Sequence, residues 1–171
     1  MKIAILNSSP RKNGNTSHLV NALSEGAMDA GHEVNMLNIG NMRIDPCYNC
    51  GYCRKEGTGE CCRKDDMQEI YPYIKDSDMI IFASPIYYWG ITGQLQSAIT
   101  RFYAFLKPKA KKYALVLSSG AENVYDAAVY QYKQMLNYFE GEDLGIKTFS
   151  GNDQQSEANL SMMHEFGRSL K

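Results

Sequence analysis

The chain has 171 residues, of which 44% are hydrophobic and 22% are charged, so we expect one domain over residues 1–171 that needs no disulfide for stability and has no disordered tract. The net charge of -1 excludes a general attraction to nucleic acid or to a membrane surface, so any anion must bind at a local site. No apolar run has the length of a membrane span or a secretory signal, and we expect a cytoplasmic protein.

The first apolar run, residues 2–7, predicts a central parallel strand that is buried on both faces. The loop after it is rich in short polar side chains, and a helical pattern runs from about residue 17 to a stop at Gly31. Gly14 is expected to allow a turn with positive φ. Because the first N–H groups of a helix are unpaired and its dipole is positive there, the loop predicts an anion site rather than an ordinary helix cap. Its candidate residues are Ser9, Arg11, Asn15, Thr16 and Ser17, with further positive charge at Lys12.

The rest of the chain repeats an alternation of strand and helix. Further strands are predicted at about residues 33–38, 78–84, 111–118 and 145–149, and helices at about 65–74 (with a distortion at Pro72), 95–106, 125–139 and 157–170. This alternation predicts an α/β fold in which a five-stranded parallel sheet carries helices on both faces. In the flavodoxin-like strand order 2-1-3-4-5, the loops after the first, third and fourth strands would converge at one ligand-binding edge.

The loop after the third strand contains three consecutive aromatic residues, Tyr87, Tyr88 and Trp89, followed by Gly90. Three adjacent aromatic side chains on a loop cannot all face the core, so at least one is expected where a flat ligand can stack; a surface patch or an oligomer contact is the alternative. A ligand with a phosphate at one end and a flat ring at the other is a mononucleotide, and a flavin fits both ends.

Other phosphate-binding classes fit the sequence less well. The GxGxxG dinucleotide fingerprint and the GxxxxGK[ST] nucleotide loop are both absent, which disfavours classical Rossmann and NTPase chemistry. A low-molecular-weight phosphatase would need a nucleophilic cysteine in the loop after the first strand, and residues 7–17 contain none.

Residues 39–64 interrupt the alternation without helical or strand periodicity, and this excursion is too long for an idle connection. It contains all five cysteines of the chain. In a reducing compartment such thiols are more often metal-binding or redox groups than disulfides. The cysteines follow the pattern Cys47-x2-Cys50-x2-Cys53-x7-Cys61, with Cys62 adjacent.

Together these motifs make the chain resemble the NADPH-dependent FMN reductase and iron-sulfur flavoprotein group. The resemblance covers roughly the first 120 residues and implies a flavodoxin-like fold that binds FMN noncovalently. One departure is Ser8, where the group commonly has glycine; we expect it to alter the loop geometry more than FMN binding. The motifs are Ser9-Pro10-Arg11-Lys12 with Gly14-Asn15-Thr16, the turn Ser84-Pro85-Ile86-Tyr87, and the Cys47, Cys50, Cys53 spacing followed by Lys64-Asp65-Asp66-Met67.

The resemblance also implies roles for particular residues. The FMN phosphate would be held by the five anion-loop candidates. The ring would lie along Pro85, Ile86, Tyr87, Tyr88, Trp89 and Gly90, with Ser118, Ser119 and Gly120 closing its other side. A [4Fe-4S] cluster would be ligated by Cys47, Cys50, Cys53 and Cys61. Zinc could use the same sulfurs, and the remaining alternative is that these cysteines hold no metal and pack the excursion or form disulfides in air.

The resulting hypothesis is an FMN-dependent oxidoreductase in which NAD(P)H delivers hydride to the flavin, and electrons pass to a quinone, another small acceptor or a protein partner. Since the cofactor carries this chemistry, no catalytic side chain is predicted. The rivals are a non-enzymatic electron carrier that uses FMN and a cluster, and a flavin-binding regulatory protein. The aromatic loop and the excursion offer apolar surface, so we expect a homodimer or a tetramer.

Overall fold

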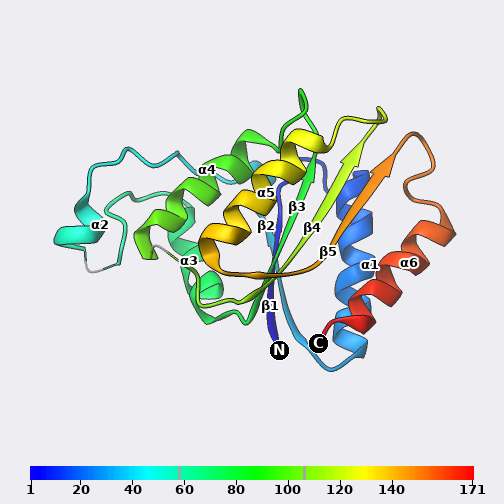
Figure 1. The fold of residues 1–171 in the computed structure, drawn as a ribbon, viewed down its shortest axis with the longest axis horizontal. Helices are drawn as coiled ribbons and strands as arrows, with labels where there is room; N and C mark the ends of the chain where they lie inside the picture. The colour runs from blue at the N-terminus through cyan, green and yellow to red at the C-terminus, as the bar shows by residue number, and fades with distance from the viewer. Residues whose placement is uncertain (58, 106) are drawn as a thin grey trace.

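The computed structural model describes residues 1–57, 59–105 and 107–171. Within these ranges a parallel sheet has the strand order β2-β1-β3-β4-β5 (Figure 1), which confirms the predicted flavodoxin-like arrangement. Register is continuous across the centre, where Ile3 of β1 lies opposite Val34 of β2 and Met79 of β3. The strands are β1 (Lys2–Asn7), β2 (Glu33–Asn38), β3 (Met79–Pro85), β4 (Lys112–Ser119) and β5 (Glu142–Ser150).

Helices cover both faces of the sheet, as predicted, because successive residues of the central strands point to opposite sides. Ile3 and Ile5 pack beneath α1 (Asn15–Asp29) and α6 (Glu157–Ser169), while Ala4 and Leu6 pack on the side of α3 (Met67–Asp76), α4 (Gly93–Arg101) and α5 (Asp126–Phe139). Figure 1 shows α1 and α6 together at one side of the sheet.

Contact between α1 and α6 depends on two glycines. A Cβ atom on Gly26 would lie 1.9 Å from the carbonyl oxygen of His164, and one on Gly167 would lie 2.1 Å from that of Leu23. Neither distance is sterically allowed, so these positions let the two helix backbones approach directly.

Several element boundaries differ from the sequence prediction. α1 begins two residues early, at Asn15, and β5 begins three residues early, because its charged first half is tolerated at a sheet edge. α4 ends at Arg101 and continues as the 3-10 turn η2 (Phe102–Phe105); the predicted end at residue 106 lies outside the described residues. α3 runs through Pro72 without a break.

Residues 39–64 form the predicted excursion, although two short elements within it, η1 (Ile39–Asn41) and α2 (Tyr52–Lys55), were not predicted. Figure 1 shows α2 at the far end of this segment, away from the sheet. The residues just after the excursion attach it to the helical layer through a buried ion pair. Arg101 Nη1 lies 2.6 Å from Asp65 Oδ2, and their side chains are 1% and 2% exposed.

The same arginine and aspartate hold the base of the excursion by further bonds. Arg101 Nη1 donates to the carbonyl oxygen of Asp45, and the Asp45 N–H donates to Asp65 Oδ2. Burial by itself would raise the pKa of Asp65, but its hydrogen bonds from Arg101 and from the Asp45 N–H outweigh burial and lower the pKa. Asp65 is therefore held as a carboxylate in the folded protein.

Candidate functional site

The loops after β1, β3 and β4 meet at the carboxyl edge of the sheet, as the strand order requires. The backbone N–H and the hydroxyl of Ser8 both donate to the carbonyl oxygen of Ala83, at 2.9 and 2.8 Å. The Ile86 N–H donates to the carbonyl oxygen of Ser118 at 2.8 Å, and the hydroxyls of Thr16 and Ser118 lie 2.6 Å apart. The Ser8 side chain thus points toward β3 and binds the two strand ends together.

Asn7, at the end of β1, organises the loop that follows. Its Oδ1 accepts from the Ser9 N–H, and its Nδ2 donates to Ser17 Oγ and to Asn38 Oδ1 at 3.1 and 3.0 Å. Ser17 Oγ in turn donates to the carbonyl oxygen of Arg11 at 2.9 Å. Asn7 is 2% exposed and was not among the predicted site residues. The sequence feature that could have identified Asn7 is its amide side chain directly after a fully apolar run.

Gly14 precedes the first residue of α1, and its role differs from the prediction. Its φ of -85° and ψ of 165° are extended, so the expected positive φ was wrong. Glycine fits here because a Cβ would lie 3.1 Å from Arg11 Cβ and 3.2 Å from Ser9 Oγ, closer than side chains normally pack. No described side chain caps the N-terminus of α1, which leaves the N–H groups of its first turn for an anion.

Positive charge borders this helix terminus. Arg11 and Lys12 are exposed and form no ion pair with any acidic residue in the described ranges. The Ser9, Thr16 and Ser17 hydroxyls bond within the protein and so shape the loop. Beside it lies a polar hollow of about 400 Å³, lined by Ser9, Lys12, Ser17, Asn21, Asn38 and Asn41.

The aromatic loop after β3 is a tight turn closed by two bonds between Tyr87 and Gly90, at 2.9 and 3.1 Å. Its central residues have positive φ, 48° at Tyr88 and 63° at Trp89. Such a turn normally has Asn or Gly at these positions, because bulky residues are strained there. The side chains of Tyr87, Tyr88 and Trp89 are 50%, 96% and 59% exposed, so all three point away from the core. Backbone strain with exposed aromatic rings is typical of a ligand-contacting loop.

The loop after β4 is tied to the loop after β5 through a residue that the sequence did not reveal. Gln154 is 1% exposed, and its Nε2 donates to the carbonyl oxygens of Ser119 and Gly151 at 2.8 and 2.7 Å. The next residue, Gln155, donates to Asn15 Oδ1 at 2.7 Å. The carboxyl edge is therefore braced from β5 back to α1.

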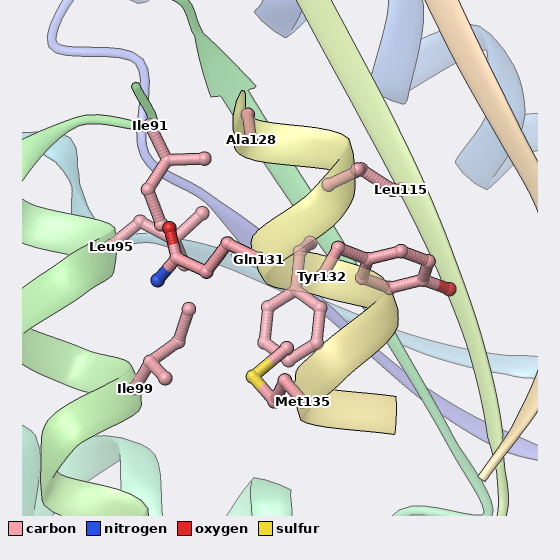
Figure 2. A pocket seen from close by; sticks show the side chains of 9 residues that line it. Ile91, Leu95, Ile99, Leu115, Ala128, Gln131, Tyr132 and Met135 are labelled. Atoms are coloured by element: carbon pink, nitrogen blue, oxygen red, sulfur yellow. The ribbon is translucent and has the colours of Figure 1, made fainter. Parts of the chain in front are cut away.

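One hollow is lined almost wholly by apolar atoms, and it is too small to be a cofactor site. It lies between α4 and α5 (Figure 2), where Leu95 and Ile99 face Gln131 and Met135. Its volume of about 10 Å³ is near the minimum for one water molecule. This hollow is a small packing gap between two helices.

All five cysteines are free thiols, and they differ in exposure, with Cys47 and Cys61 half-buried. Cys53 is 8% exposed, and burial raises its pKa, with smaller contributions from Cys61 and Cys47 nearby. Cys50 and Cys62 are exposed, and their sulfurs lie 3.9 Å apart.

The predicted cluster ligands do not gather into a metal-binding arrangement. Among the described residues, no group of three or more His, Cys, Asp or Glu side chains is placed to hold a metal ion. The cluster at Cys47, Cys50, Cys53 and Cys61 therefore stays a prediction, and no chemistry is derived through it. None of the described helices is both long enough and apolar enough to cross a bilayer.

A parallel sheet of order 2-1-3-4-5, with an uncapped helix after β1 and an exposed aromatic turn after β3, defines a protein of the flavodoxin-like class. The model of the NADPH-dependent FMN reductase family matches residues 1–155, and the chain belongs to this family.

Several proteins with similar sequences are named iron-sulfur flavoproteins. An iron-sulfur flavoprotein from Archaeoglobus fulgidus is 36% identical over 105 residues, which are 61% of this chain and 47% of that protein. One from Methanosarcina thermophila is 35% identical over 121 residues, 71% of this chain and 61% of that protein. The chain thus spans about half the length of these relatives.

Solved structures support the fold. An NAD(P)H:quinone oxidoreductase from Methanothermobacter marburgensis matches with a TM-score of 0.75 at 16% identity, over 99% of this chain and 95% of that one. An azoreductase from Bacillus anthracis matches with a TM-score of 0.74 at 16% identity, over 99% of this chain and 100% of that one. At this identity the similarity concerns the fold alone.

Proposed function

We propose that this protein is an FMN-dependent oxidoreductase that takes hydride from NADH or NADPH and passes electrons to a quinone, another small acceptor or a protein partner. One observation carries the proposal. An uncapped, positively charged helix terminus and a strained turn of exposed aromatic residues lie at the ends of the adjacent strands β1 and β3. A phosphate and a flat ring on one ligand would meet them together.

The described residues fit FMN at both ends. The phosphate would be held by Arg11 and by the N–H groups of the loop and of the first turn of α1, because the loop hydroxyls already bond within the protein. The ring would lie against the turn at residues 85–90, with Ser118, Ser119 and Gly120 on its other side. Bound FMN would supply the hydride-accepting ring, and the protein would bind it, orient it and exclude water.

Titration with FMN tests the proposal through Trp89, which is the only tryptophan in the sequence. Added FMN should quench the tryptophan emission strongly, and the loaded protein should oxidise NADH or NADPH when a quinone is supplied. If emission is unchanged and no nicotinamide is oxidised at saturating FMN, the assignment fails. Quenching without turnover would support FMN binding and contradict the proposed enzymatic activity.

A second candidate function is electron transfer between proteins through FMN and an iron-sulfur cluster. It is favoured by the names of the relatives and by the nearness of Cys47 and Cys61 to Cys53. It requires Cys50 to join those three sulfurs as the fourth ligand. Iron and acid-labile sulfide analysis of protein isolated without oxygen tests it, and about four irons per chain would support it.

We also propose that the protein works in a reducing compartment such as the cytoplasm and assembles as a homodimer or a tetramer. Five free thiols in one short segment suit a reducing compartment. The exposed aromatic turn supplies apolar surface for a second copy. Light scattering at high micromolar concentration tests the assembly, and a monomer there would contradict it.

A further inference from the structure

The short turn η1, which follows β2, packs against the loop between β1 and α1. Gly40 lies directly beside the peptide that joins Ser9 to Pro10, because a Cβ atom added to Gly40 would be 2.3 Å from the Ser9 carbonyl oxygen and 2.7 Å from the Pro10 nitrogen. Side chains do not approach a backbone this closely, so glycine is required at this position. Asn41, the next residue, reaches the same loop, and its Nδ2 donates to the Pro10 carbonyl oxygen at 2.8 Å.

η1 is itself anchored to the rest of the molecule. Ile39 is 0% exposed and belongs to the core, and the residue before it, Asn38, accepts a bond from Asn7 at 3.0 Å. Beyond the turn, the carbonyl oxygen of Met42 accepts from the side chain of Gln94 on α4. Because both of its ends are held, η1 can act as a fixed support for the loop.

The contacts with η1 fix the direction of two carbonyl oxygens in the loop. The Pro10 carbonyl and the Arg11 N–H belong to one trans peptide, in which the two groups point in opposite directions. The bond from Asn41 to the carbonyl therefore also orients the N–H, which donates to Ser9 Oγ at 3.3 Å. A carbonyl oxygen carries partial negative charge and would repel a phosphate. The carbonyl oxygens of residues 9 and 10 are instead held against η1.

We propose that Gly40 and Asn41 are positioning residues that give the site its preference for phosphorylated flavins. They hold the Ser9 and Pro10 carbonyl oxygens toward η1, so the phosphate meets the Arg11 guanidinium and the N–H groups of the first turn of α1. The two residues act through the loop and not by contact with the ligand. This inference rests on the proposed function, because it concerns how the same site recognises the phosphate of FMN.

Parallel titrations of the full chain with FMN and with riboflavin test the role of Asn41. Asn41→Ala should weaken FMN binding about fivefold, because the released carbonyl can turn toward the phosphate, and should leave riboflavin binding within about twofold of wild type. A purely structural role would weaken both flavins alike. Asn137→Ala, at another exposed asparagine on α5, is the matched control and should change neither affinity. Asn41 is also exposed, so alanine should leave the fold intact, and circular dichroism checks this.

Gly40→Ala tests the close approach of η1 to the loop. Its Cβ must displace the peptide between residues 9 and 10, so FMN binding should fall at least about tenfold, and by much more than riboflavin binding. Gly93→Ala is the matched control, because a Cβ at the start of α4 would meet no atom of the described residues within 4 Å. Its affinities for both flavins should stay within about twofold of wild type.

Hydrogen exchange of the flavin-free protein separates positioning from direct contact with the phosphate. Asn41 also lines the polar hollow beside the loop, so a direct contact would equally lower FMN affinity in Asn41→Ala. If Asn41 holds the loop, the N–H groups of residues 11–14 should exchange at least about threefold faster in Asn41→Ala than in wild type or Asn137→Ala. A residue that only touched the phosphate would leave this exchange unchanged.

The outcomes separate this proposal from the proposed function. If wild type binds FMN, but Asn41→Ala and Gly40→Ala weaken FMN and riboflavin equally or weaken neither, the positioning role is wrong and the proposed function stands. Unchanged exchange at residues 11–14 in Asn41→Ala would also overturn the positioning role. If wild type binds neither flavin, the proposed function fails and this proposal fails with it.

Discussion

Replacement of Arg11 by alanine isolates the charge of the proposed phosphate site. The backbone at Arg11 is fixed independently of its side chain, because its N–H and its carbonyl oxygen both bond to Ser9 Oγ, at 3.3 and 3.2 Å, and its carbonyl oxygen also accepts from Ser17. The guanidinium is exposed and has no acidic partner among the described residues. Arg11→Ala should therefore remove a free positive charge and leave the loop in place.

The size of the effect follows from the charge of the contact. A hydrogen bond between charged groups contributes about 1.5 to 3 kcal/mol, so Arg11→Ala should weaken FMN binding by roughly 10- to 150-fold. Because Arg11 is exposed, water and salt screen its charge, and we expect a loss near the tenfold end. Isothermal titration or tryptophan quenching measures it.

Riboflavin provides the ligand control, because it has the same ring and no phosphate. Its affinity should be almost unchanged by Arg11→Ala. Arg168→Ala provides the protein control, since Arg168 lies on α6, pairs with Glu165 and is remote in sequence from the loop. Equal losses for FMN and riboflavin, or no loss for either, would refute the placement of the phosphate beside Arg11.

Three further changes test other parts of the structure. Trp89→Gly should relieve the left-handed strain and raise the free energy of unfolding of the flavin-free protein by about 1 kcal/mol, yet weaken FMN binding about fivefold or more through loss of an aromatic contact; stronger binding would contradict the stacking role. Asp65→Asn should lower the free energy of unfolding by about 3 to 5 kcal/mol, because it leaves Arg101 buried without its counter-charge. Since folding lowers the Asp65 pKa, the contribution of this carboxylate to the free energy of unfolding is present above the unfolded pKa of about 3.9. It is lost as pH falls through the lower folded value. The free energy of unfolding, measured by urea denaturation from pH 6 to pH 2, should therefore fall less steeply in Asp65→Asn than in wild type. Gly26→Ala should lower the free energy of unfolding by about 1 to 3 kcal/mol or more, because the new Cβ would overlap the carbonyl oxygen of His164. An unchanged melting temperature would disprove the close contact of α1 with α6.

Much of the fold was predictable because it is encoded in short-range patterns. Continuous apolar runs identified the buried strands, and periodic apolar residues with Gly31 as a stop identified α1. General rules predicted a parallel sheet with helices on both faces, and the strand order came from the resemblance to flavodoxin-like proteins. That order then placed the loops after β1, β3 and β4 at one edge. Polar residues after one strand and aromatic residues after another were therefore enough to predict a composite site.

Tertiary structure decided the features that depend on residues far apart in the chain. The Thr16–Ser118 contact, the Gln154 brace and the Asp65–Arg101 pair join segments that no local pattern connects. Backbone conformation was also decided there. Gly14 is extended, and its neighbours leave little room for a Cβ, while Tyr88 and Trp89 adopt the positive φ for which their side chains are poorly suited.

The cysteines illustrate the same division. Their spacing indicated a metal or redox role, because that judgement needs only the number and type of ligands in a short segment. Which sulfurs meet depends on how the excursion folds back on itself, and this is fixed by the contacts of Arg63 with Tyr48 and Asp45 and by the buried Asp65–Arg101 pair beneath them. Residue types and local periodicity can be read directly from the sequence. Contacts between residues that are distant in the sequence depend on packing, charge burial and loop closure acting together.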